Sequence, residues 1–527
     1  MENIQQLLRN NNVSELVSEI LLSQELTYSQ ISQILTDKKY PLESEHLNKI
    51  IDRIYKAKAL EEKVVIIGDY DADGIMATTI LVKALKELEI EVGFYIPDRL
   101  KEGYGINKGI VDMVNEKGYS LIITVDNGVV AYTALDHAKS LGLDVIVTDH
   151  HTIDKKYNYD YDFLLHPDHL SEGYNDLAGA GIALLIAEKL LNGKNIGDYY
   201  VYAMVATIAD MVSVFGYNRN IIKNGLFILN KFGHRHIENL IHYRNGKIDQ
   251  QVISFQVVPK LNTAGRLADQ VNVNDIVKYF LLDNNVEIEE KAKSITSLNQ
   301  ERITMTKDSF ENSNGLKKFG SLNVVIDESI HEGLTGLIAG RHMNKINEPV
   351  LVLTKNGDLY KGSGRSPKGY DIFSLINPHK DLLESFGGHK QACGVSIQAD
   401  KLETFLNLIT KDSKDIKVEI ISDPFLTLDI KKLDLGVYED FEKLEPYGVD
   451  FIKPLLKINV KIIEKPVVLA EKYLKWKINN GIELISFARN LDLEYYKNIK
   501  EIDAYIDLSL NEYRGRKTIN LIIQEFL

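Results

Sequence analysis

The stretch VVIIGDYDADGIMATTI, residues 64–80, passes from a short β-branched apolar run into three aspartates at alternate positions and a glycine. This order begins like the calcium loop of an EF-hand. Such a loop needs a bidentate carboxylate at its twelfth position, and counting from Asp69 brings Ile80 there. An EF-hand loop also follows a helix, whereas VVII is typical of a buried strand. We therefore expect Asp69, Asp71 and Asp73 to lie where a strand ends and a helix begins.

Apolar runs of this kind recur at a spacing of about 25 residues, with helix-favouring segments such as ATTILVKALKELE between them. The alternation predicts an α/β fold with a parallel, doubly wound sheet. Each run is nearly continuous in apolar residues, as strands covered on both faces should be. The four runs are VVIIG (64–68), EVGFYI (91–96), YSLIITV (119–125) and LDVIVT (143–148).

Three of these four predicted strands end in residues that can bind metals. In an open parallel sheet, ligands bind at the carboxyl ends of strands near the point where the strand order reverses. Topology would thus bring acids from distant parts of the sequence together. The residues are Asp69, Asp71 and Asp73 after the first strand, Asp126 after the third, and Asp149, His150 and His151 after the fourth.

A further acid, Asp210, ends the very apolar helical segment VYAMVATIADM. It is a candidate ligand, with a helix cap or an ion pair as the alternative interpretation. Carboxylates with imidazole and no thiolate favour Mn²⁺ or Mg²⁺ over structural zinc. This many acids could share a pocket only with cations, and two divalent ions bridged by a carboxylate are the usual means of hydrolysing phosphate esters.

The rest of the chain changes character several times. Residues 284–314 are highly charged and free of proline and glycine, which predicts a long linking helix or simply a solvated one. Short apolar runs and glycine-rich turns then indicate a smaller α/β domain, and the last hundred residues indicate a small β-barrel of the OB type. We predict five parts: a helical extension (1–60), the sheet domain (61–283), the connecting helix (284–314), the smaller α/β domain (315–412) and the OB-like domain (418–527).

The composition and length indicate an acidic, multidomain globular protein. The chain has 527 residues, of which 44% are hydrophobic, and a formal net charge of -13, which argues against a generally basic nucleic-acid coat. A single cysteine, Cys393, excludes an internal disulfide and fits a reducing cytoplasm. The first residues lack the order of a signal peptide, and no apolar run approaches the length of a membrane span. We expect a cytoplasmic monomer.

The motifs GDYDADG, TVDNG, VTDHH and TIADMVS resemble those of the DHH phosphoesterase superfamily in type and order. Further motifs are similar to those of its bacterial single-strand-specific DNA exonucleases, and together the motifs span roughly residues 64 to 400. The resemblance implies a DHH domain, a connecting helix, a DHH-associated domain and an OB-like domain. The further motifs are IPDRLKEGYGIN (96–107), AGAGIA (178–183), PKLNTAGRLAD (259–269), HEGLTGLIAGR (331–341), GSGRS (362–366) and FGGHKQACG (386–394).

The resemblance also implies roles for individual residues. The implied metal ligands are Asp71, Asp73, Asp126, His150 and Asp210. Asp126 would bridge two cations, Asp149 would orient His150, and His151 would contact the scissile phosphate. Ile67 stands where many relatives have a histidine, so Asp69 or water would complete one metal site.

For the DNA path, Arg266 and Arg365 offer forked donors suited to phosphate oxygens, and the run Gly387, Gly388 and His389 offers backbone N–H groups beside a possible donor. By resemblance these residues line a groove between two lobes. The alternatives are a structural ion pair for Arg266 and simple turn formation for the two glycines. Cys393 is interpreted as a packing residue.

The predicted function is a metal-dependent 5′ to 3′ exonuclease that degrades single-stranded DNA to mononucleotides in recombination and repair. Its partners would be single-stranded DNA and, by resemblance, a helicase and a single-strand-binding protein. One alternative is a DHH enzyme that cleaves short oligonucleotides or cyclic dinucleotides. Another is a degenerate scaffold, which the full set of candidate ligands disfavours.

Overall fold

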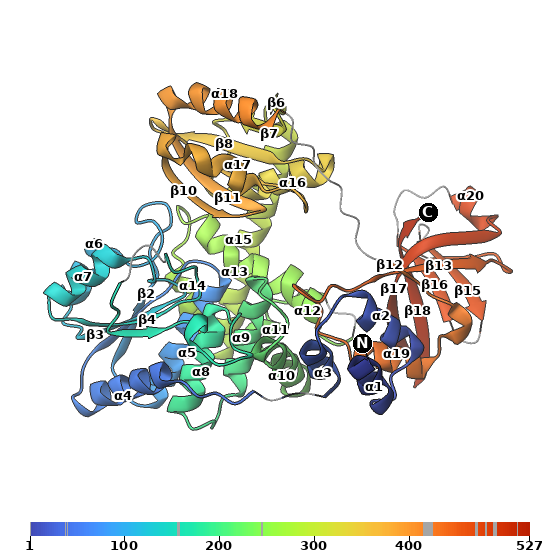
Figure 1. The fold of residues 1–527 in the computed structure, drawn as a ribbon, viewed down its shortest axis with the longest axis horizontal. Coiled ribbons are helices and arrows are strands. Elements are labelled where there is room, and N and C mark those ends of the chain that lie inside the picture. The colour runs from blue at the N-terminus through green and yellow to red at the C-terminus, as the bar shows by residue number, and fades with distance from the viewer. Residues whose placement is uncertain are drawn as a thin grey trace. The chain divides into compact units, whose positions relative to one another are not determined.

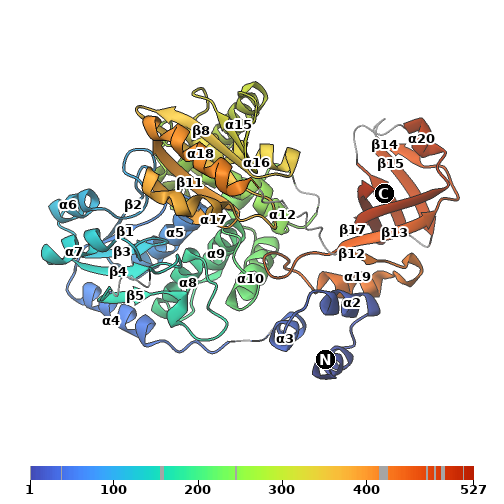
Figure 2. The ribbon, with the colours of Figure 1, turned by 45° about the horizontal axis from the view of Figure 1, so that its top comes forward.

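The computed structural model describes residues 2–36, 38, 40–154, 159–243, 246–414, 425–469, 473–479, 482–487, 493–513 and 515–527. These residues form two compact units, which are visible in Figures 1 and 2. The larger unit comprises Leu42–Asp210 and Ile221–Ile421. The smaller unit comprises Met1–Pro41, Met211–Asn220 and Ser422–Leu527. The predicted helical extension, residues 1–60, is therefore divided between the two units.

Among the described residues, a five-stranded parallel sheet organises the first part of the larger unit, with strand order β2-β1-β3-β4-β5. The predicted parallel α/β sheet is thus confirmed, and a short fifth strand was not predicted. That strand has only the three residues FLL, which are too few to show a period in the sequence. The strands are β1 (Val64–Ile67), β2 (Val92–Tyr95), β3 (Leu121–Val125), β4 (Asp144–Thr148) and β5 (Phe163–Leu165).

Helices cover both faces of this sheet, as Figure 1 shows. Helices α6 (Lys108–Glu116) and α7 (Tyr132–Ser140) contribute to one apolar cluster with alternate residues of the strands. On the opposite face lie α4 (Glu45–Ala59), α5 (Ala72–Glu87) and α8 (Gly179–Leu190), which contact the strands, and α9 (Gly197–Ala209), which packs against α5 and α8. Helix α5 is buried along almost its whole length, which explains its continuous run of small and apolar residues.

The strand order reverses between β1 and β3, because the chain leaves β1 for β2 on one side and returns to β3 on the other. The carboxyl ends of these two neighbouring strands form the position where open α/β sheets bind ligands. Asp69 and Asp71 follow β1, and Asp126 follows β3. The topology therefore places these three acids at one edge of the sheet.

A helical segment follows the sheet and leads to the second sheet of the larger unit. Its last helix, α15, is the predicted connecting helix, begins one residue after its cap at Asn284 and has mostly exposed charged residues. One stretch of this segment has π-helical geometry, Ile253–Val257. The helices are α10 (Tyr217–Phe232), α11 (Arg235–Glu238), α12 (Gln250–Val252), α13 (Val258–Arg266), α14 (Asn274–Phe280) and α15 (Asn285–Asn312).

The second sheet of the larger unit is mixed and has the order β10-β11-β9-β8-β7-β6 within the described residues. Cys393 is 3% exposed in an apolar core between this sheet and α18, which agrees with its predicted packing role. The elements are β6 (Lys317–Phe319), β7 (Leu322–Ile326), a 3-10 turn (Glu332–Leu334), α16 (Thr335–Ile346), β8 (Val350–Asn356), β9 (Leu359–Arg365), α17 (Ile372–Ile376), β10 (Leu383–His389), β11 (Ala392–Gln398) and α18 (Leu402–Ser413).

The smaller unit combines N-terminal helices with a C-terminal sheet of seven strands, counted over the described residues, in the order β12-β13-β17-β18-β16-β15-β14. The predicted boundary at residue 418 lies outside the described residues. The elements are α1 (Glu2–Asn10), α2 (Glu15–Ser23), α3 (Tyr28–Thr36), β12 (Phe425–Thr427), α19 (Leu435–Glu442), β13 (Leu455–Lys461), β14 (Val467–Leu469), β15 (Tyr473–Asn479), β16 (Ile482–Ser486), α20 (Leu493–Lys497), β17 (Glu501–Tyr513) and β18 (Arg516–Phe526).

Across the part of the chain that the structure describes, no helix combines the length and apolarity required to span a bilayer.

Candidate metal centre

The loop after β1 brings the first aspartates to the N-terminus of α5. Asp71 is the N-cap of this helix, and its Oδ1 accepts hydrogen bonds from the N–H groups of Asp73 (2.9 Å) and Gly74 (3.1 Å). Both of these cap hydrogen bonds go to Oδ1. Asp69 is 4% exposed, and its Oδ1 has no hydrogen-bond partner. A Cβ at Gly74 would lie 2.4 Å from the Asp69 carbonyl oxygen, so only glycine allows this tight turn.

Asp73 lies at the N-termini of two helices, because α8 begins directly opposite its side chain. Its Oδ2 accepts from the Gly179 N–H at 2.6 Å and its Oδ1 from the Ala180 N–H at 2.7 Å. The first N–H groups of a helix have no partner within the helix and favour a negative charge. The first glycine of AGAGIA, Gly179, is explained by a neighbouring residue, since a Cβ there would lie 2.7 Å from the Asp126 Cβ.

Asp126 follows β3 in the left-handed backbone region, with φ of 60°. The next residue, Asn127, fixes this turn: its Nδ2 donates to the carbonyls of Ile67 (3.0 Å) and Val125 (2.9 Å), and its Oδ1 accepts from the Ile106 N–H (3.2 Å). Asp126 is 2% exposed, and its Oδ1 has no hydrogen-bond partner. A buried, unpaired carboxylate oxygen of this kind requires a cation or a proton.

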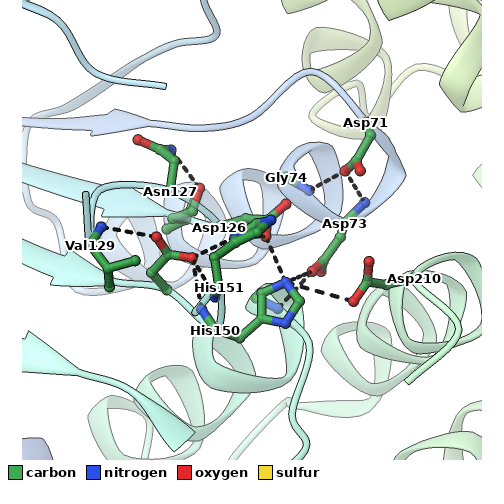
Figure 3. Close-up of polar contacts among 12 residues, drawn as sticks. Asp71, Asp73, Gly74, Asp126, Asn127, Val129, His150, His151 and Asp210 are labelled. Atoms are coloured by element: carbon green, nitrogen blue, oxygen red, sulfur yellow. Dashed lines mark hydrogen bonds and ion pairs between the residues drawn. The ribbon is translucent and has the colours of Figure 1, made fainter. Parts of the chain in front are cut away.

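His150 lies at the centre of the acids, as Figure 3 shows. Its Nε2 is 3.1 Å from Asp126 Oδ1, 3.7 Å from Asp73 Oδ2 and 3.6 Å from Asp210 Oδ2, and it has no hydrogen-bond partner. Asp210 stands at the C-terminus of α9. Burial lowers the pKa of His150 to about 4, so at neutral pH its imidazole is uncharged and Asp210 does not form an ion pair with it.

Asp149 contacts the side chain of His151, and this differs from the expectation that it orients His150. Its Oδ1 accepts from His151 Nδ1 at 2.8 Å and from the backbone N–H groups of His150 (2.8 Å) and His151 (3.1 Å). Its Oδ2 accepts from the Val129 N–H at 3.0 Å. The turn after β4 directs the two imidazoles differently, so Asp149 reaches His150 only through its backbone. Spacing in the sequence could not distinguish adjacent histidines.

The pKa values of these side chains are shifted by burial and by the charges of their neighbours. Burial, followed by the charges of Asp73, Asp71, Asp69 and Asp210, raises the pKa of Asp126. Burial and neighbouring acids also raise the pKa of Asp73 to about 7 and that of Asp210 to about 8. Burial lowers the pKa of His151, but the hydrogen bond and charge of Asp149 outweigh burial and raise it to about 9. Carboxylates held together without cations are therefore costly to ionise.

The donor atoms fit divalent cations. Hard carboxylate oxygens and a neutral imidazole are ligands for Mn²⁺ and Mg²⁺. Asp126 and His150 each belong to two of the donor groups, which is the arrangement that two neighbouring cations sharing a bridging carboxylate require. Three groups of side chains have donor atoms within 4.8 Å of one another: Asp126, His150 and His151; Asp73, His150 and Asp210; and Asp69, Asp71 and Asp126.

A group of arginines adjoins the acidic loop. Burial, with the charges of Arg99, Arg302 and Arg365, lowers the pKa of Arg266 to about 10. The guanidinium of Arg99 lies over the Tyr70 ring, 4.8 Å from its centroid, and its charge acts on Asp69. Within the described residues, none of these four arginines forms an ion pair with a carboxylate, so no structural ion pair of Arg266 is seen there. Unneutralised arginines that are partly buried are suited to bind phosphate.

The remaining predicted residues lie elsewhere. Gly387, Gly388 and His389 occupy the exposed end of β10 in the second sheet. As far as the chain is described, the His389 side chain makes no polar contact with the acidic residues. Gly388 has φ of 141°, and a Cβ there would lie 2.2 Å from the Ala392 carbonyl oxygen, so its glycine is required by the hairpin itself.

Three residues that contact the site were not predicted. The Tyr104 hydroxyl donates to the Asp126 carbonyl at 2.8 Å and lies 3.2 Å from His151 Nδ1. Asn262 Oδ1 accepts from the Ala72 N–H at 2.7 Å, which fixes the start of α5. Arg99 joins the arginine group. All three lie in the quoted motifs EGYG, PKLNTAGR and IPDR, but nothing in their spacing indicates a partner.

Comparisons with known proteins agree with this site. Residues 63–213 match the DHH family, N-terminal domain, residues 320–414 match the DHHA1 domain, and residues 426–525 match the RecJ OB domain. The chain is 28% identical to the single-stranded-DNA-specific exonuclease RecJ of Bacillus subtilis, over 98% of this chain and 68% of that protein. It is 27% identical to the RecJ of Escherichia coli, over 90% of this chain and 89% of that protein.

The chain is similar to RecJ proteins over most of its length.

Solved RecJ structures share its fold. The RecJ of Thermus thermophilus in complex with Mn²⁺ superposes with a TM-score of 0.83 at 23% identity, covering 100% of this chain and 78% of that chain. An exonuclease RecJ bound to manganese superposes with a TM-score of 0.60 at 27% identity, covering 72% of this chain and 96% of that chain. The predicted combination of DHH, DHH-associated and OB-like folds is thereby confirmed.

Proposed function

We propose that this chain is a metal-dependent exonuclease that degrades single-stranded DNA from its 5′ end to mononucleotides in recombination and repair. The observation that carries the proposal is the placement of an acidic cluster around His150 near a group of arginines that have no carboxylate partner among the described residues, where the charge of Arg99 acts on Asp69. Such a pairing suits a phosphodiester held by arginines with its phosphorus near bound cations. Relatives that resemble the chain over most of its length are named single-stranded-DNA-specific exonucleases.

Asp71, Asp73, Asp126, His150 and Asp210 hold two divalent cations in this proposal, with Asp126 shared and Asp69 as an additional ligand. When bound, Mn²⁺ or Mg²⁺ would supply water activation and neutralisation of charge on the phosphate. A RecJ structure at 27% identity contains manganese, which supports this assignment. Three buried atoms of this site have no hydrogen-bond partner among the described residues, and such ligation would satisfy them: Asp69 Oδ1, Asp126 Oδ1 and His150 Nε2.

His151 contacts the scissile phosphate in this proposal. Its Nδ1–H is directed to Asp149, which leaves Nε2 to face the substrate. Because Asp149 raises the pKa of His151 to about 9, the imidazolium persists at neutral pH and can donate to a phosphate oxygen. Asp149 acts through His151, as the carboxylate that keeps the ring oriented and charged.

The arginines bind the DNA backbone. Arg266 and Arg365 are the predicted phosphate contacts, and Arg99 and Arg302 add to the same positive potential. Since the group is partly buried beside the acidic loop, it suits a single flexible strand better than a stiff duplex. Gly387, Gly388 and His389 are further candidate contacts on the second sheet of the larger unit.

The remaining assignments follow from the same proposal. The parts 61–283, 315–412 and 418–527 serve as the catalytic, DHH-associated and OB-like domains, with 284–314 as the connecting helix and 1–60 as the helical extension. An enzyme restricted to single strands needs a supply of unwound DNA, so a helicase and a single-strand-binding protein are the partners we propose. The protein acts as a cytoplasmic monomer.

A DHH-type oligonucleotide or cyclic-dinucleotide phosphodiesterase is the alternative. The acidic cluster alone would serve either reaction. The match of residues 426–525 to a RecJ OB domain favours the exonuclease, because a strand-binding domain has no use on substrates of two to five nucleotides.

The test follows a 5′-phosphorylated single strand labelled at its 3′ end, with Mn²⁺ or with EDTA, beside a matched duplex. We expect progressive shortening from the 5′ end that requires metal and spares the duplex. Asp126→Asn should lower the rate about a thousandfold or more, because it removes the shared ligand. Asp112→Asn, at a half-exposed residue of α6, is the matched control and should keep full activity.

A long strand that survives while di- to pentanucleotides are consumed would establish the alternative. Full activity of Asp126→Asn would remove the metal assignment.

A further inference from the structure

His166 contacts the backbone of the Asp149–His150–His151 turn. Its Nε2 lies 2.9 Å from the His151 carbonyl oxygen, and its Nδ1 lies 3.1 Å from the Asp168 nitrogen. The side chain is 4% exposed. We infer that His166 is a positioning residue that holds the two histidines of the proposed metal centre in place, an inference that rests on the proposed function.

The parallel pairing of β4 and β5 creates this contact. Thr148 and Leu165 are register partners, so the residues that follow the two strands leave the sheet side by side. The Asp149 N–H donates to the Leu165 carbonyl at 3.3 Å, which continues the pairing by one step. His166, the residue immediately after β5, is thereby placed beside the turn that carries His150 and His151.

The hydrogen bonds assign the protons of the His166 ring. A backbone N–H can only donate, so Nδ1 must accept from Asp168 and is unprotonated. In a neutral imidazole the proton is then on Nε2, which donates to the His151 carbonyl. Both nitrogens are thus satisfied in a buried position, and each makes a different contact: one caps the short helical turn Pro167–His169, and the other holds His151.

Hydrogen bonds therefore hold two N–H groups and a carbonyl group of this turn. Asp149 binds the N–H groups of His150 and His151, and His166 binds the carbonyl of His151. This turn sets the 3.1 Å approach of His150 Nε2 to Asp126 Oδ1. Residues that orient metal ligands in this way generally affect metal affinity and rate by about 10- to 100-fold.

Two substitutions separate the two contacts of the ring. In His166→Asn the amide oxygen takes the place of Nδ1 and can still cap the turn, since asparagine is a preferred N-cap, but no donor reaches His151. In His166→Gln the longer side chain places its amide N–H near the position of Nε2 and can donate to the His151 carbonyl. The matched control is His242→Asn, the same change at an exposed histidine elsewhere in the larger unit.

The measurements on the full-length chain are Mn²⁺ affinity by calorimetry, kcat and KM on single-stranded DNA, and thermal unfolding without metal. For His166→Asn we expect Mn²⁺ affinity and kcat to fall about 10- to 100-fold with little change in KM. His166→Gln should restore both to within about threefold of the unmodified protein. His242→Asn should change neither quantity.

A purely structural role would give a different pattern. His166→Gln would then be the more damaged variant, because it loses the cap, and Mn²⁺ affinity would follow the loss of thermal stability in both variants. Equal Mn²⁺ affinities for His166→Asn and the unmodified protein would also overturn the inference. If the unmodified protein binds Mn²⁺ but cleaves no DNA, the proposed function fails, while the Mn²⁺ affinities of the two variants still decide the role of His166. Absence of Mn²⁺ binding by the unmodified protein would overturn both.

Discussion

Replacement of Arg266 by methionine should make the metal-free protein more stable and its binding to DNA weaker. Arg266 is held near Arg99, Arg302 and Arg365 without a carboxylate partner among the described residues, and burial together with these charges lowers its pKa to about 10. Its ordinary pKa is higher by about two to three units, which corresponds to about 3 kcal/mol for keeping the guanidinium charged in the folded state.

Methionine has a similar volume and keeps much of the apolar contact that the arginine stem makes. After a deduction for imperfect packing, we expect the free energy of unfolding to rise by about 1 to 2 kcal/mol. The melting temperature of the metal-free protein should rise by about 1–3 °C. Arg9→Met, at an exposed residue of α1, is the control and should change the melting temperature little.

DNA binding is measured by fluorescence anisotropy of a 5′-phosphorylated single strand in EDTA, over a range of salt concentrations. Loss of one phosphate contact should lower the affinity about tenfold and reduce the slope of log K against log salt by about 0.7. A variant that is less stable and binds DNA as before would show that Arg266 is a structural residue. The reasoning about an unneutralised phosphate site would then be wrong.

Two further predictions concern stability. Burial, with the charge of His234, lowers the pKa of His236 to about 4 in the folded protein, below its value near 6.5 in the unfolded chain. As the pH falls, the unfolded chain therefore binds the proton first. The stability that is present above pH 6.5 is lost as a result. This residue should therefore lower the free energy of unfolding, measured in urea, by about 2 kcal/mol between pH 7 and pH 5. In His236→Gln, whose side chain can still donate to the Leu282 carbonyl, the free energy of unfolding should change less with pH. The same pH dependence in the variant and the unmodified protein would contradict the assignment. Gly388→Ala should lower the free energy of unfolding by about 1–3 kcal/mol, because a φ of 141° disfavours alanine and its Cβ would lie 2.2 Å from the Ala392 carbonyl oxygen. Gly387→Ala should change the free energy of unfolding by less than about 0.5 kcal/mol, because a Cβ at Gly387 would have no atom within 4 Å among the described residues. Equal thermal unfolding of the two alanine variants would show that the hairpin adapts.

The strand ends could be read from the sequence because two regularities coincide there. Buried parallel strands are continuous apolar runs, so VVII, LIITV and the run ending in IVT are recognisable without a structure. Parallel strands in one sheet end at one edge, so acids that follow them are brought together whatever their separation in the chain. Asp71, Asp126 and His150 were expected to meet for this reason, and the structure brings them together.

Side-chain partners could not be read in the same way. Asp149 contacts the ring of His151 and only the backbone of His150, a distinction that depends on the turn after β4. The short strand β5 has too few residues to show a period, and without it the contact of His166 cannot be foreseen. The arginine group likewise joins Arg99 to Arg266 and Arg365, which lie on three separate segments.

The sequence by itself therefore determined the parallel sheet, the connecting helix and the set of acids and histidines at the carboxyl ends of the strands, because these depend on local periodicity and on the common direction of the strands. Only the tertiary structure decided which oxygen each helix N-terminus uses, which histidine Asp149 holds, and which arginines share one surface. These contacts depend on distances of a few ångströms between segments far apart in the chain, and such distances are set by how helices and turns pack around the sheet, which no residue spacing records.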